Sequence, residues 1–243
     1  MTGAILITGA SSGIGAATAK LFLQEGWAVG LFARREGALH QVAEGAPRAH
    51  VLTGDVTDAA EVKAAVARFA AEAGRLDAVF NNAGVFSPPG LPDDIPQEEW
   101  DRAIDVNLRG MILVARAAFA QMRSQSPQGG RIINNGSISA HRPREQAGPY
   151  TVTKHAITGL TQQLALDGRS LGIAAGQIDI GNARTEMIAG IAAHAEAAGQ
   201  APPPSFDVAD AARAVWHMAT LPPEANVLSM TIMATRMPYV GRG

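Results

Sequence analysis

The sequence predicts an α/β fold built on a mostly parallel, seven-stranded sheet that is doubly wound, with helices on both faces. Short apolar runs of strand length alternate with longer Ala-rich runs of helical periodicity along the chain, and this alternation is typical of parallel sheets. The strand-length runs are also nearly continuously hydrophobic, as expected for strands covered on both faces. Right-handed crossovers then place helices on each side of the sheet.

Each predicted element follows from its local pattern. The first strand, residues 4–8, is an apolar run that ends in a glycine-rich turn. Apolar side chains recur at helical spacing in residues 58–73, and Pro149 suits the first turn of a helix, where its missing N–H costs least. The helix that starts at residue 208 stops before two prolines. In chain order, the predicted strands are residues 4–8, 27–33, 50–53, 76–80, 131–138, 173–180 and 227–234, and the predicted helices are residues 14–24, 58–73, one or two within 98–125, 149–171 and 208–221.

The composition is that of one globular domain over residues 1–243. Of the 243 residues, 47% are hydrophobic and 17% are charged, which is enough apolar material for a large core. The net charge of −2, without a block of Lys or Arg, argues against nucleic acid or an anionic membrane as a partner. The absence of cysteine excludes disulfides, thiolate nucleophiles and Cys-ligated metal sites.

No segment of the sequence is predicted to direct the chain to a membrane. Residues 1–10 lack a basic leader region and a cleavage pattern, and residues 111–120 are interrupted by Arg116 and too short to span a bilayer. We therefore expect a cytoplasmic protein. The Ala-rich stretch 190–204 ends in three prolines, and we expect residues 185–205 to form a mobile substrate lid.

A glycine-rich turn, TGASSGIG at residues 8–15, follows the first strand. Glycine tolerates left-handed φ angles and lets the backbone approach a ligand, and the N-terminus of the next helix attracts a pyrophosphate. A tight turn that only packs is the alternative, but the place of this turn after the first strand favours phosphate binding. The expected contacts are Gly9, Ser11, Ser12, Gly13, Ile14 and Gly15.

The predicted helix 149–171 carries Tyr150 and Lys154 one turn apart on one face. A phenol has a pKa of about 10, and a nearby ammonium lowers it, so the pair is a candidate general acid and base. Ser137 lies at the predicted end of the fifth strand, on the edge of the sheet where ligands bind. Surface packing is the alternative explanation of the Tyr-x-x-x-Lys spacing alone.

Taken together, these motifs resemble the short-chain dehydrogenase/reductase family in its compact single-domain branch. The resemblance covers nearly the whole chain, and it implies a Rossmann fold and a homo-oligomer, a tetramer or a dimer. It also implies an oxidoreductase, a carbonyl reductase by its expected direction, that transfers a hydride between a nicotinamide and a carbonyl or secondary alcohol. The motifs that carry it are TGxxxGxG at residues 8–15, Asp55-Val56, Asn81-Asn82-Ala83-Gly84, Asn107, Ser137 and Tyr150-x-x-x-Lys154.

The resemblance implies roles for the matched residues. Ser137 would bind the substrate carbonyl oxygen, Tyr150 would transfer the proton, and Lys154 would also hold the nicotinamide ribose. Asn107 resembles an asparagine that supports a water relay to the lysine, although a buried amide bonded to the backbone is the alternative. Further cofactor contacts are expected from Asp55, Val56, Asn82, Ala83, Gly84, Tyr150, Lys154, Gly181 and Thr185.

Arginines end the second strand, where an acidic residue would bind both ribose hydroxyls. Arg34 and Arg35 suit a 2′-phosphate by charge and fork geometry. In the family this arrangement implies NADP(H) in preference to NAD(H), with Arg34 as the leading contact. The alternatives are a solvated basic pair for the arginines and a turn-capping role for Asp55.

The sequence departs from the family pattern at several places. Ile180 stands where a proline is usual, so the loop that follows is expected to be more flexible or differently placed. Arg184 is a candidate for binding a cofactor phosphate or a substrate anion, with a plain surface position as the alternative. His141, Arg142 and Arg144 precede Tyr150 and are candidates for binding an anionic substrate group, unless they are simply exposed. The tail, residues 236–240, is expected to reach a neighbouring subunit.

The main competing interpretation is a non-catalytic NADP(H)-binding sensor or scaffold on the same fold. Such proteins usually lose the tyrosine or the lysine, and this chain keeps both. A serine hydrolase is disfavoured because Ser137 lacks the GxSxG elbow. Sugar-modifying epimerases and dehydratases generally carry a larger C-terminal substrate region.

Overall fold

The computed structural model describes residues 3–197 and 199–240, and it contains a seven-stranded sheet in the order β3-β2-β1-β4-β5-β6-β7. Every neighbouring pair of strands is parallel. The order runs outward from β1 in one direction and from β4 in the other, so the sheet is doubly wound, as predicted. The strands are β1 (Ala4–Thr8), β2 (Ala28–Ala33), β3 (Ala49–Thr53), β4 (Ala78–Asn81), β5 (Gly130–Asn135), β6 (Ile173–Ile180) and β7 (Ser229–Ile232).

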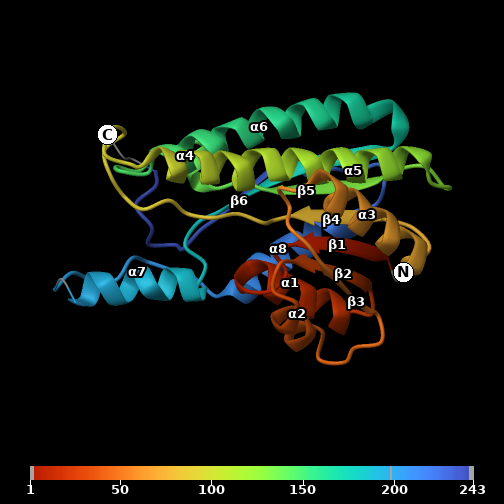
Figure 1. Cartoon of the computed structure of the whole chain (residues 1–243), viewed down its shortest axis with the longest axis horizontal. Coiled ribbons are helices and arrows are strands. Elements are labelled where there is room, and N and C mark those ends of the chain that lie inside the picture. The colour runs from red at the N-terminus through yellow and green to blue at the C-terminus, as the bar shows by residue number, and fades with distance from the viewer. Residues whose placement is uncertain (1–2, 198, 241–243) are drawn as a thin grey trace.

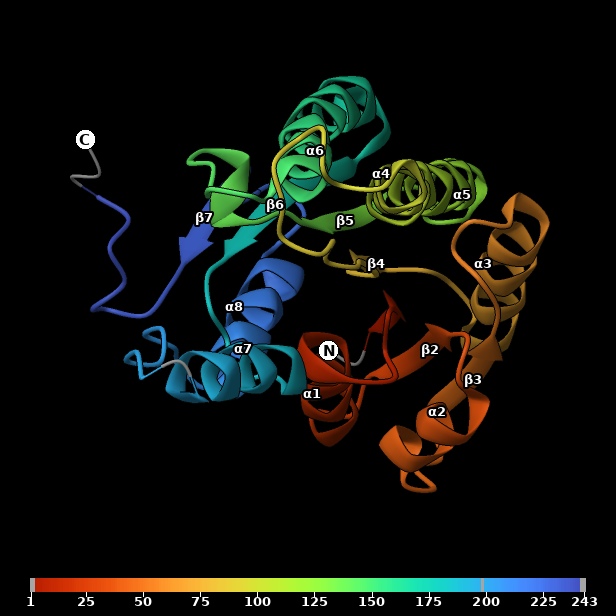
Figure 2. The same ribbon diagram turned by 60° about the vertical axis from the view of Figure 1, so that its left-hand side comes forward.

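Helices cover both faces of the sheet (Figures 1 and 2). Buried residues of α1, α2 and α8 pack in one core cluster, and those of α3 and α5, with part of α6, pack in the other. The helical segments are α1 (Gly13–Gln24), α2 (Glu36–Ala43), α3 (Ala59–Ala73), α4 (Gln97–Ile104), the π-helical turn η1 (Asp105–Gly110), α5 (Met111–Ser124), the 3₁₀ turn η2 (Ile138–Ala140), α6 (Gly148–Gly168), the 3₁₀ turn η3 (Arg169–Leu171), α7 (Glu186–Ala197) and α8 (Val208–Thr220).

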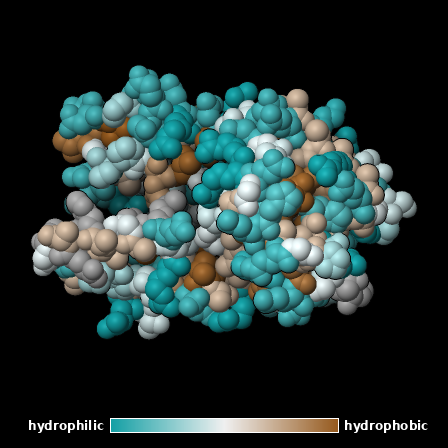
Figure 3. Space-filling model, turned by 60° about the horizontal axis from the view of Figure 1, so that its bottom comes forward, coloured by the Kyte–Doolittle hydropathy of each residue, from teal (hydrophilic) through white to brown (hydrophobic). Residues whose placement is uncertain are grey.

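The two cores alternate along the strands. In β1, Ile5 and Ile7 belong to the core under α1 and α8, whereas Ala4 and Leu6 belong to the core under α3 and α5. Successive side chains of a strand point to opposite faces, so a continuously apolar strand requires cover on both sides. The face in Figure 3 is mostly hydrophilic, with hydrophobic residues in small patches. In the described part of the chain, no helix is both long and apolar enough to cross a membrane.

Some predicted boundaries are wrong. The fifth strand was predicted to reach Ile138, but it ends at Asn135; Ser137 then caps η2, its hydroxyl accepting the N–H of Ser139 at 3.1 Å. Residues 190–197 were expected to be irregular and instead belong to α7, because their Ala-rich composition favours a helix. The helix α2 was not delimited from the sequence, and β7 is shorter than predicted.

Candidate active site

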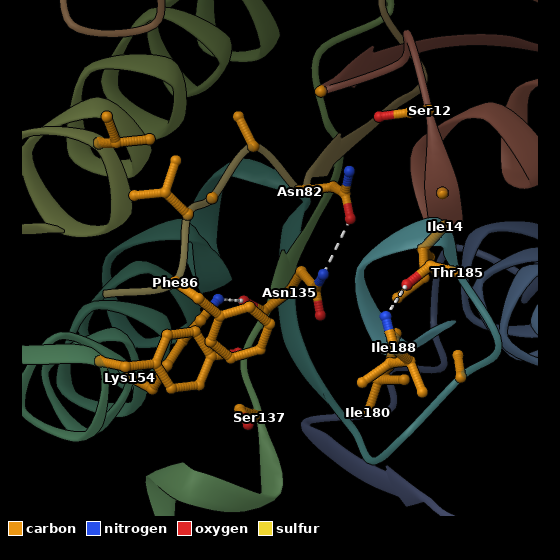
Figure 4. A pocket seen from close by; sticks show the side chains of 18 of the residues that line it. Ser12, Ile14, Asn82, Phe86, Asn135, Ser137, Lys154, Ile180, Thr185 and Ile188 are labelled. Carbon is orange, nitrogen blue, oxygen red and sulfur yellow. Dashed lines mark hydrogen bonds between the residues drawn. The ribbon is translucent and has the colours of Figure 1, made fainter. Parts of the chain in front are cut away.

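A cavity of about 460 Å³ lies at the carboxyl edge of the sheet, where the strand order reverses. Dinucleotides bind at this point in doubly wound sheets. In Figure 4, Ser12, Ile14 and Thr185 lie on one side of the cavity, and Phe86, Ser137 and Lys154 lie on the other. All the site residues predicted from the sequence line this cavity except Gly15 and Asn107.

The glycine-rich turn lines one end of the cavity. Gly9 and Gly13 have φ angles of +64° and +54°, a left-handed conformation that favours glycine. Gly15 has a packing role, because a Cβ there would lie 2.3 Å from the carbonyl oxygen of Gly9. The side chain of Ser12 does not cap α1, so the positive end of this helix is suited to an anion.

The two arginines after β2 differ in their contacts. The Nη2 atom of Arg35 donates to the hydroxyls of Ser11 and Ser12 at 3.1 and 3.0 Å. Arg34 lies 3.8 Å from Asp55 in an exposed ion pair, and exposed pairs of this kind contribute little stability. Asp55 also accepts bonds from the backbone and hydroxyl of Thr57. Asp55 therefore has the turn-capping role that was the alternative, and it also lines the cavity, where a cofactor contact was expected.

The segment after β4 ties three strand ends together. The Thr8 hydroxyl accepts the N–H groups of Asn82 and Ala83 at 2.8 and 2.9 Å. Asn135 in turn donates its side-chain amide to Asn82 at 2.8 Å (Figure 4). These bonds hold the ends of β1, β4 and β5 in one arrangement at the floor of the cavity.

Tyr150 and Lys154 face the cavity from α6, as their spacing predicts. Lys154 Nζ lies 5.6 Å from the centre of the Tyr150 ring and donates to the carbonyl oxygen of Asn135 at 2.7 Å. The ring of Phe86 lies against Tyr150, with 4.3 Å between ring centres. The serine at 137 lines the same cavity, so the three predicted catalytic side chains meet there.

The direction expected for the Tyr150 pKa is wrong. Burial raises the pKa of the Tyr150 phenol, outweighing the lowering effects of a hydrogen bond with Ser137 and of the Arg144 charge. Burial also lowers the pKa of Lys154 to about 8. Removing either group from water disfavours its charged form, so at neutral pH the site holds a protonated phenol beside an ammonium.

Asn107 is buried in η1 and does not line the cavity. Its Oδ1 accepts the Val85 N–H at 2.7 Å, and its Nδ2 donates to the Val85 carbonyl at 2.8 Å. The nearest further partner of its amide is the Thr153 hydroxyl at 3.4 Å. These contacts match the alternative of a buried amide bonded to the backbone, and they position the chain after β4.

The sequence interpretation missed Asp179, a completely buried carboxylate in β6. It accepts the Ser137 N–H at 2.9 Å and the Gln177 amide at 2.7 Å, and its second oxygen lies 2.7 Å from His141 Nε2. A Cβ at Gly136 would lie 2.1 Å from this carboxylate, so glycine there is required for the contact. The available signal was an aspartate in a mostly apolar strand, because a charge is rarely buried without a partner.

The sixth strand ends at Ile180, as the sequence predicts. Ile180 is buried and extends β6 by pairing with Ile232, so the strand continues where a proline was usual. Arg184 pairs with Asp207 at 3.1 Å and does not line the cavity, in agreement with a surface position. Met237 of the tail lines the cavity of its own chain.

The described part of the chain holds no cluster of three or more His, Cys, Asp or Glu side chains that is suited to a metal ion. Beside the phosphate-binding turn, the cavity is lined by a phenol, a hydroxyl and an ammonium. That combination suits proton transfer to a substrate held next to a dinucleotide.

Among solved structures, the chain is similar to a dehydrogenase and a reductase. It superposes on a closed form of serine dehydrogenase complexed with NADP⁺ with a TM-score of 0.89, at 26% identity and covering 99% of this chain and 98% of the other. It also superposes on levodione reductase with a TM-score of 0.84, at 28% identity and 95% coverage of both chains.

Comparison with known sequences agrees. The chain is 40% identical over 192 residues to an A-factor type γ-butyrolactone 1′-reductase (1S-forming) from Streptomyces virginiae, covering 76% of this chain and 73% of the relative. It is 29% identical to sulfoacetaldehyde reductase 2 from Chromohalobacter salexigens, over 98% and 97% of the two chains. Residues 3–196 match the family model for short chain dehydrogenases. The chain therefore belongs to the short-chain dehydrogenase/reductase family, whose members named here are oxidoreductases.

Proposed function

We propose that the protein is an NADP(H)-dependent carbonyl reductase in which Tyr150 is the general acid and base. The observation that carries the proposal is the cavity itself. One end is a phosphate-binding turn with Arg35 beside it, and the other end holds Ser137, Tyr150 and Lys154. A dinucleotide bound along the cavity would therefore connect these two ends.

The residues of the chain supply binding and the proton. When bound, the nicotinamide supplies or accepts the hydride. The hydroxyls of Ser137 and Tyr150 hold the substrate oxygen and stabilise the negative charge that develops on it. Because burial raises the pKa of Tyr150, its phenol is protonated at neutral pH and is ready to donate. This supports carbonyl reduction as the working direction.

Lys154 keeps a positive charge next to the phenol. Its pKa of about 8 leaves the ammonium mostly protonated at neutral pH, within reach of the Asn135 carbonyl. The charge stabilises the phenolate that remains after proton donation. The same ammonium is the proposed contact for the nicotinamide ribose, and Asn107 supports this site by holding the chain at Val85.

The preference for NADP(H) over NAD(H) rests on Arg34 and Arg35. Arg35 already donates to the two serines of the phosphate-binding turn, and Arg34 lines the adjacent part of the cavity. An acidic residue that would repel a 2′-phosphate is missing from the end of β2. Among the similar solved structures, some are described with NADPH or NADP⁺ and one with NADH.

Three further features belong to the same proposal. Residues 185–205 form a substrate lid that includes α7, which extends beyond the sheet in Figure 1. The protein is a cytoplasmic homo-oligomer, a tetramer or a dimer. The exposed apolar side chains of Val152 and Leu166 on α6, 53% and 57% exposed, support a subunit interface there, which sedimentation equilibrium tests directly.

The proposed reaction is tested by following the loss of NADPH absorbance with a panel of aldehydes and ketones. The parent protein is compared with Tyr150→Phe, which keeps the ring and its packing on Phe86 but removes the hydroxyl. We expect the variant to lose at least about 100-fold in kcat, the usual contribution of a general acid. Equal activities in the two proteins would refute the tyrosine mechanism. A parent that binds NADPH and reduces nothing would favour the sensor alternative.

A further inference from the structure

We propose that the substrate is a short carbonyl compound that carries an acidic group, and that Arg144 binds this group. The inference rests on the proposed reductase function and names its substrate class. A carboxylate, a sulfonate or a phosphate has the required chemistry, because each presents paired anionic oxygens to a guanidinium fork.

Arg144 is the basic residue of its loop that reaches the cavity. The loop between η2 and α6 carries His141, Arg142 and Arg144, and only Arg144 is among the cavity-lining residues. His141 is instead held by the buried carboxylate of Asp179 at 2.7 Å. The structure therefore separates three residues that the sequence could not distinguish.

The guanidinium of Arg144 lies beside the catalytic phenol. It lies over the ring of Phe86, with 5.7 Å between its central carbon and the ring centre. Phe86 packs on Tyr150 with a centre-to-centre distance of 4.3 Å and a tilt of 31°. These two contacts place the central carbon of the guanidinium at most about 10 Å from the centre of the Tyr150 ring, and the positive charge is close enough to lower the pKa of Tyr150. A molecule that touches both groups is therefore short.

In the described part of the chain, the N–H groups of Arg144 are free for a ligand, whereas each of the other cations that line the cavity already has a partner. Arg34 pairs with Asp55, Arg35 donates to two serines, and Lys154 donates to a backbone carbonyl. Among the side chains that the structure describes, Arg144 has no carboxylate partner and no hydrogen-bond partner. Its contact with Phe86 is a cation–π contact, which uses none of its N–H groups as hydrogen-bond donors to a carboxylate and leaves them for an anion.

An acidic residue also lines the cavity, and its position agrees with this assignment. Glu186 begins α7 and follows Thr185. The methyl group of Thr185 lies 3.2 Å from the position that a Cβ at Gly13 would occupy. This places residue 185 against the phosphate-binding turn, on the side of the cavity opposite Phe86 (Figure 4). An anionic substrate group at Arg144 thus lies on the side away from the start of α7.

The test compares carboxylates with their methyl esters, which lack the charge and add one methyl group: levulinate and its ester, and acetoacetate and its ester. A short aldehyde that carries a sulfonate, and the same aldehyde with a hydroxyl in place of the sulfonate, form a second set. Comparing this set with the carboxylates distinguishes a preference for sulfonate from one for carboxylate. The enzymes are the parent, Arg144→Gln, Arg144→Lys, and Arg142→Gln as the matched control on the same loop. The readout is the ratio of kcat/KM for each acid to that for its neutral partner, so that any effect of Arg144 on Tyr150 cancels.

We expect the parent to favour the acids. Arg144→Gln should lower the acid-to-neutral ratio by about 10- to 100-fold, as expected for loss of one charge-assisted contact. Arg144→Lys should keep part of the preference, and Arg142→Gln should leave it unchanged. A parent that favours the neutral compounds, or equal ratios in the parent and Arg144→Gln, would overturn the inference and leave the reductase function standing.

Failure of the reductase function would give a different pattern. If the parent reduces none of these compounds, calorimetric titration of its complex with NADPH replaces turnover as the readout. Binding of levulinate but not of its ester, lost in Arg144→Gln, would still support the anion site. No difference in binding between the acid and the ester would refute it.

Discussion

Replacing Asp179 by Asn removes a buried negative charge next to the catalytic centre while keeping the shape of the side chain. The carboxylate is completely buried and contacts three groups: the N–H of Ser137, the amide of Gln177 and the ring of His141. An asparagine has one oxygen acceptor and an NH₂ group. At one of the two carboxylate oxygen positions, a hydrogen-bond acceptor is therefore replaced by a donor.

The size of the effect follows from these contacts. Bonds to a charged group contribute about 1.5–3 kcal/mol each, against about 1 kcal/mol for neutral ones. His141 is partly exposed and can adapt by changing which ring nitrogen carries the proton. The bonds from Ser137 and Gln177 therefore weaken, and in the bond with His141 the donor and the acceptor change places. Together these changes predict a loss of about 2–3 kcal/mol, which lowers Tm by roughly 4–12 °C in a protein of this size.

The same substitution moves the pH dependence of reduction. The negative charge of Asp179 raises the pKa of Tyr150 and that of Lys154, so its removal lowers both. Tyr150 donates a proton in the reductive direction only while it is protonated. As the pH increases, the activity of Asp179→Asn should therefore decline at a lower pH than the activity of the parent. The assay is kcat for NADPH-dependent reduction measured across pH, with Tm measured by calorimetry on the same samples.

Asp167→Asn is the matched control. Asp167 is an exposed acid on α6 whose described partner is Gln163, so this variant should change neither Tm nor the pH profile. If Asp179→Asn leaves the alkaline limb where it is in the parent, or moves it to higher pH, the electrostatic reasoning is wrong. A fall in Tm alone would show only a structural role.

Three further predictions concern other parts of the cavity. Arg35→Ala removes the proposed contact to the 2′-phosphate, so it should raise KM for NADPH by about 10- to 100-fold and change KM for NADH by less than about threefold. Parallel changes in the two KM values would contradict this assignment. Gly136→Ala should unfold the protein at a Tm lower by several degrees, because its Cβ would lie 2.1 Å from Asp179. The control Gly159→Ala, in α6 with nothing within 4 Å, should be neutral or stabilising by about 0.5–1 kcal/mol, and equal effects of the two alanines would count against the steric argument. Lys154→Met should abolish activity yet raise Tm at pH 7, because burial lowers the pKa of Lys154 to about 8 and so disfavours the folded charged form. This destabilisation of the folded protein is complete below pH 8. Between pH 8 and 10.5 it is relieved, because the lysine loses its proton in the folded protein before it does so in the unfolded one. The Tm difference should therefore shrink as pH rises through this range, and a constant difference would refute the linkage.

Much of the fold was predictable because its signals are local. Strands buried on both faces are mostly apolar, and β1 and β6 were predicted with the boundaries that the structure has. The spacing of Tyr150 and Lys154 places them on one face of any helix. Left-handed glycines at a strand-to-helix turn likewise need no distant partner to be recognised.

The boundaries that failed depend on partners far along the chain. Ser137 leaves β5 early because its N–H is bound by Asp179, 42 residues later. A local pattern does not contain this partner, so the prediction extended the fifth strand too far.

What the sequence by itself determined is the succession of the strands and the meeting of the phosphate-binding turn with Ser137, Tyr150 and Lys154 at the carboxyl edge of the sheet. Only the tertiary structure decided how those side chains behave. It selected Arg144 over His141 as the free cation at the substrate end, and it raised rather than lowered the pKa of Tyr150. The physical reason is that ion pairing and desolvation depend on what surrounds a group in space, and those surroundings come from segments that the sequence keeps far apart.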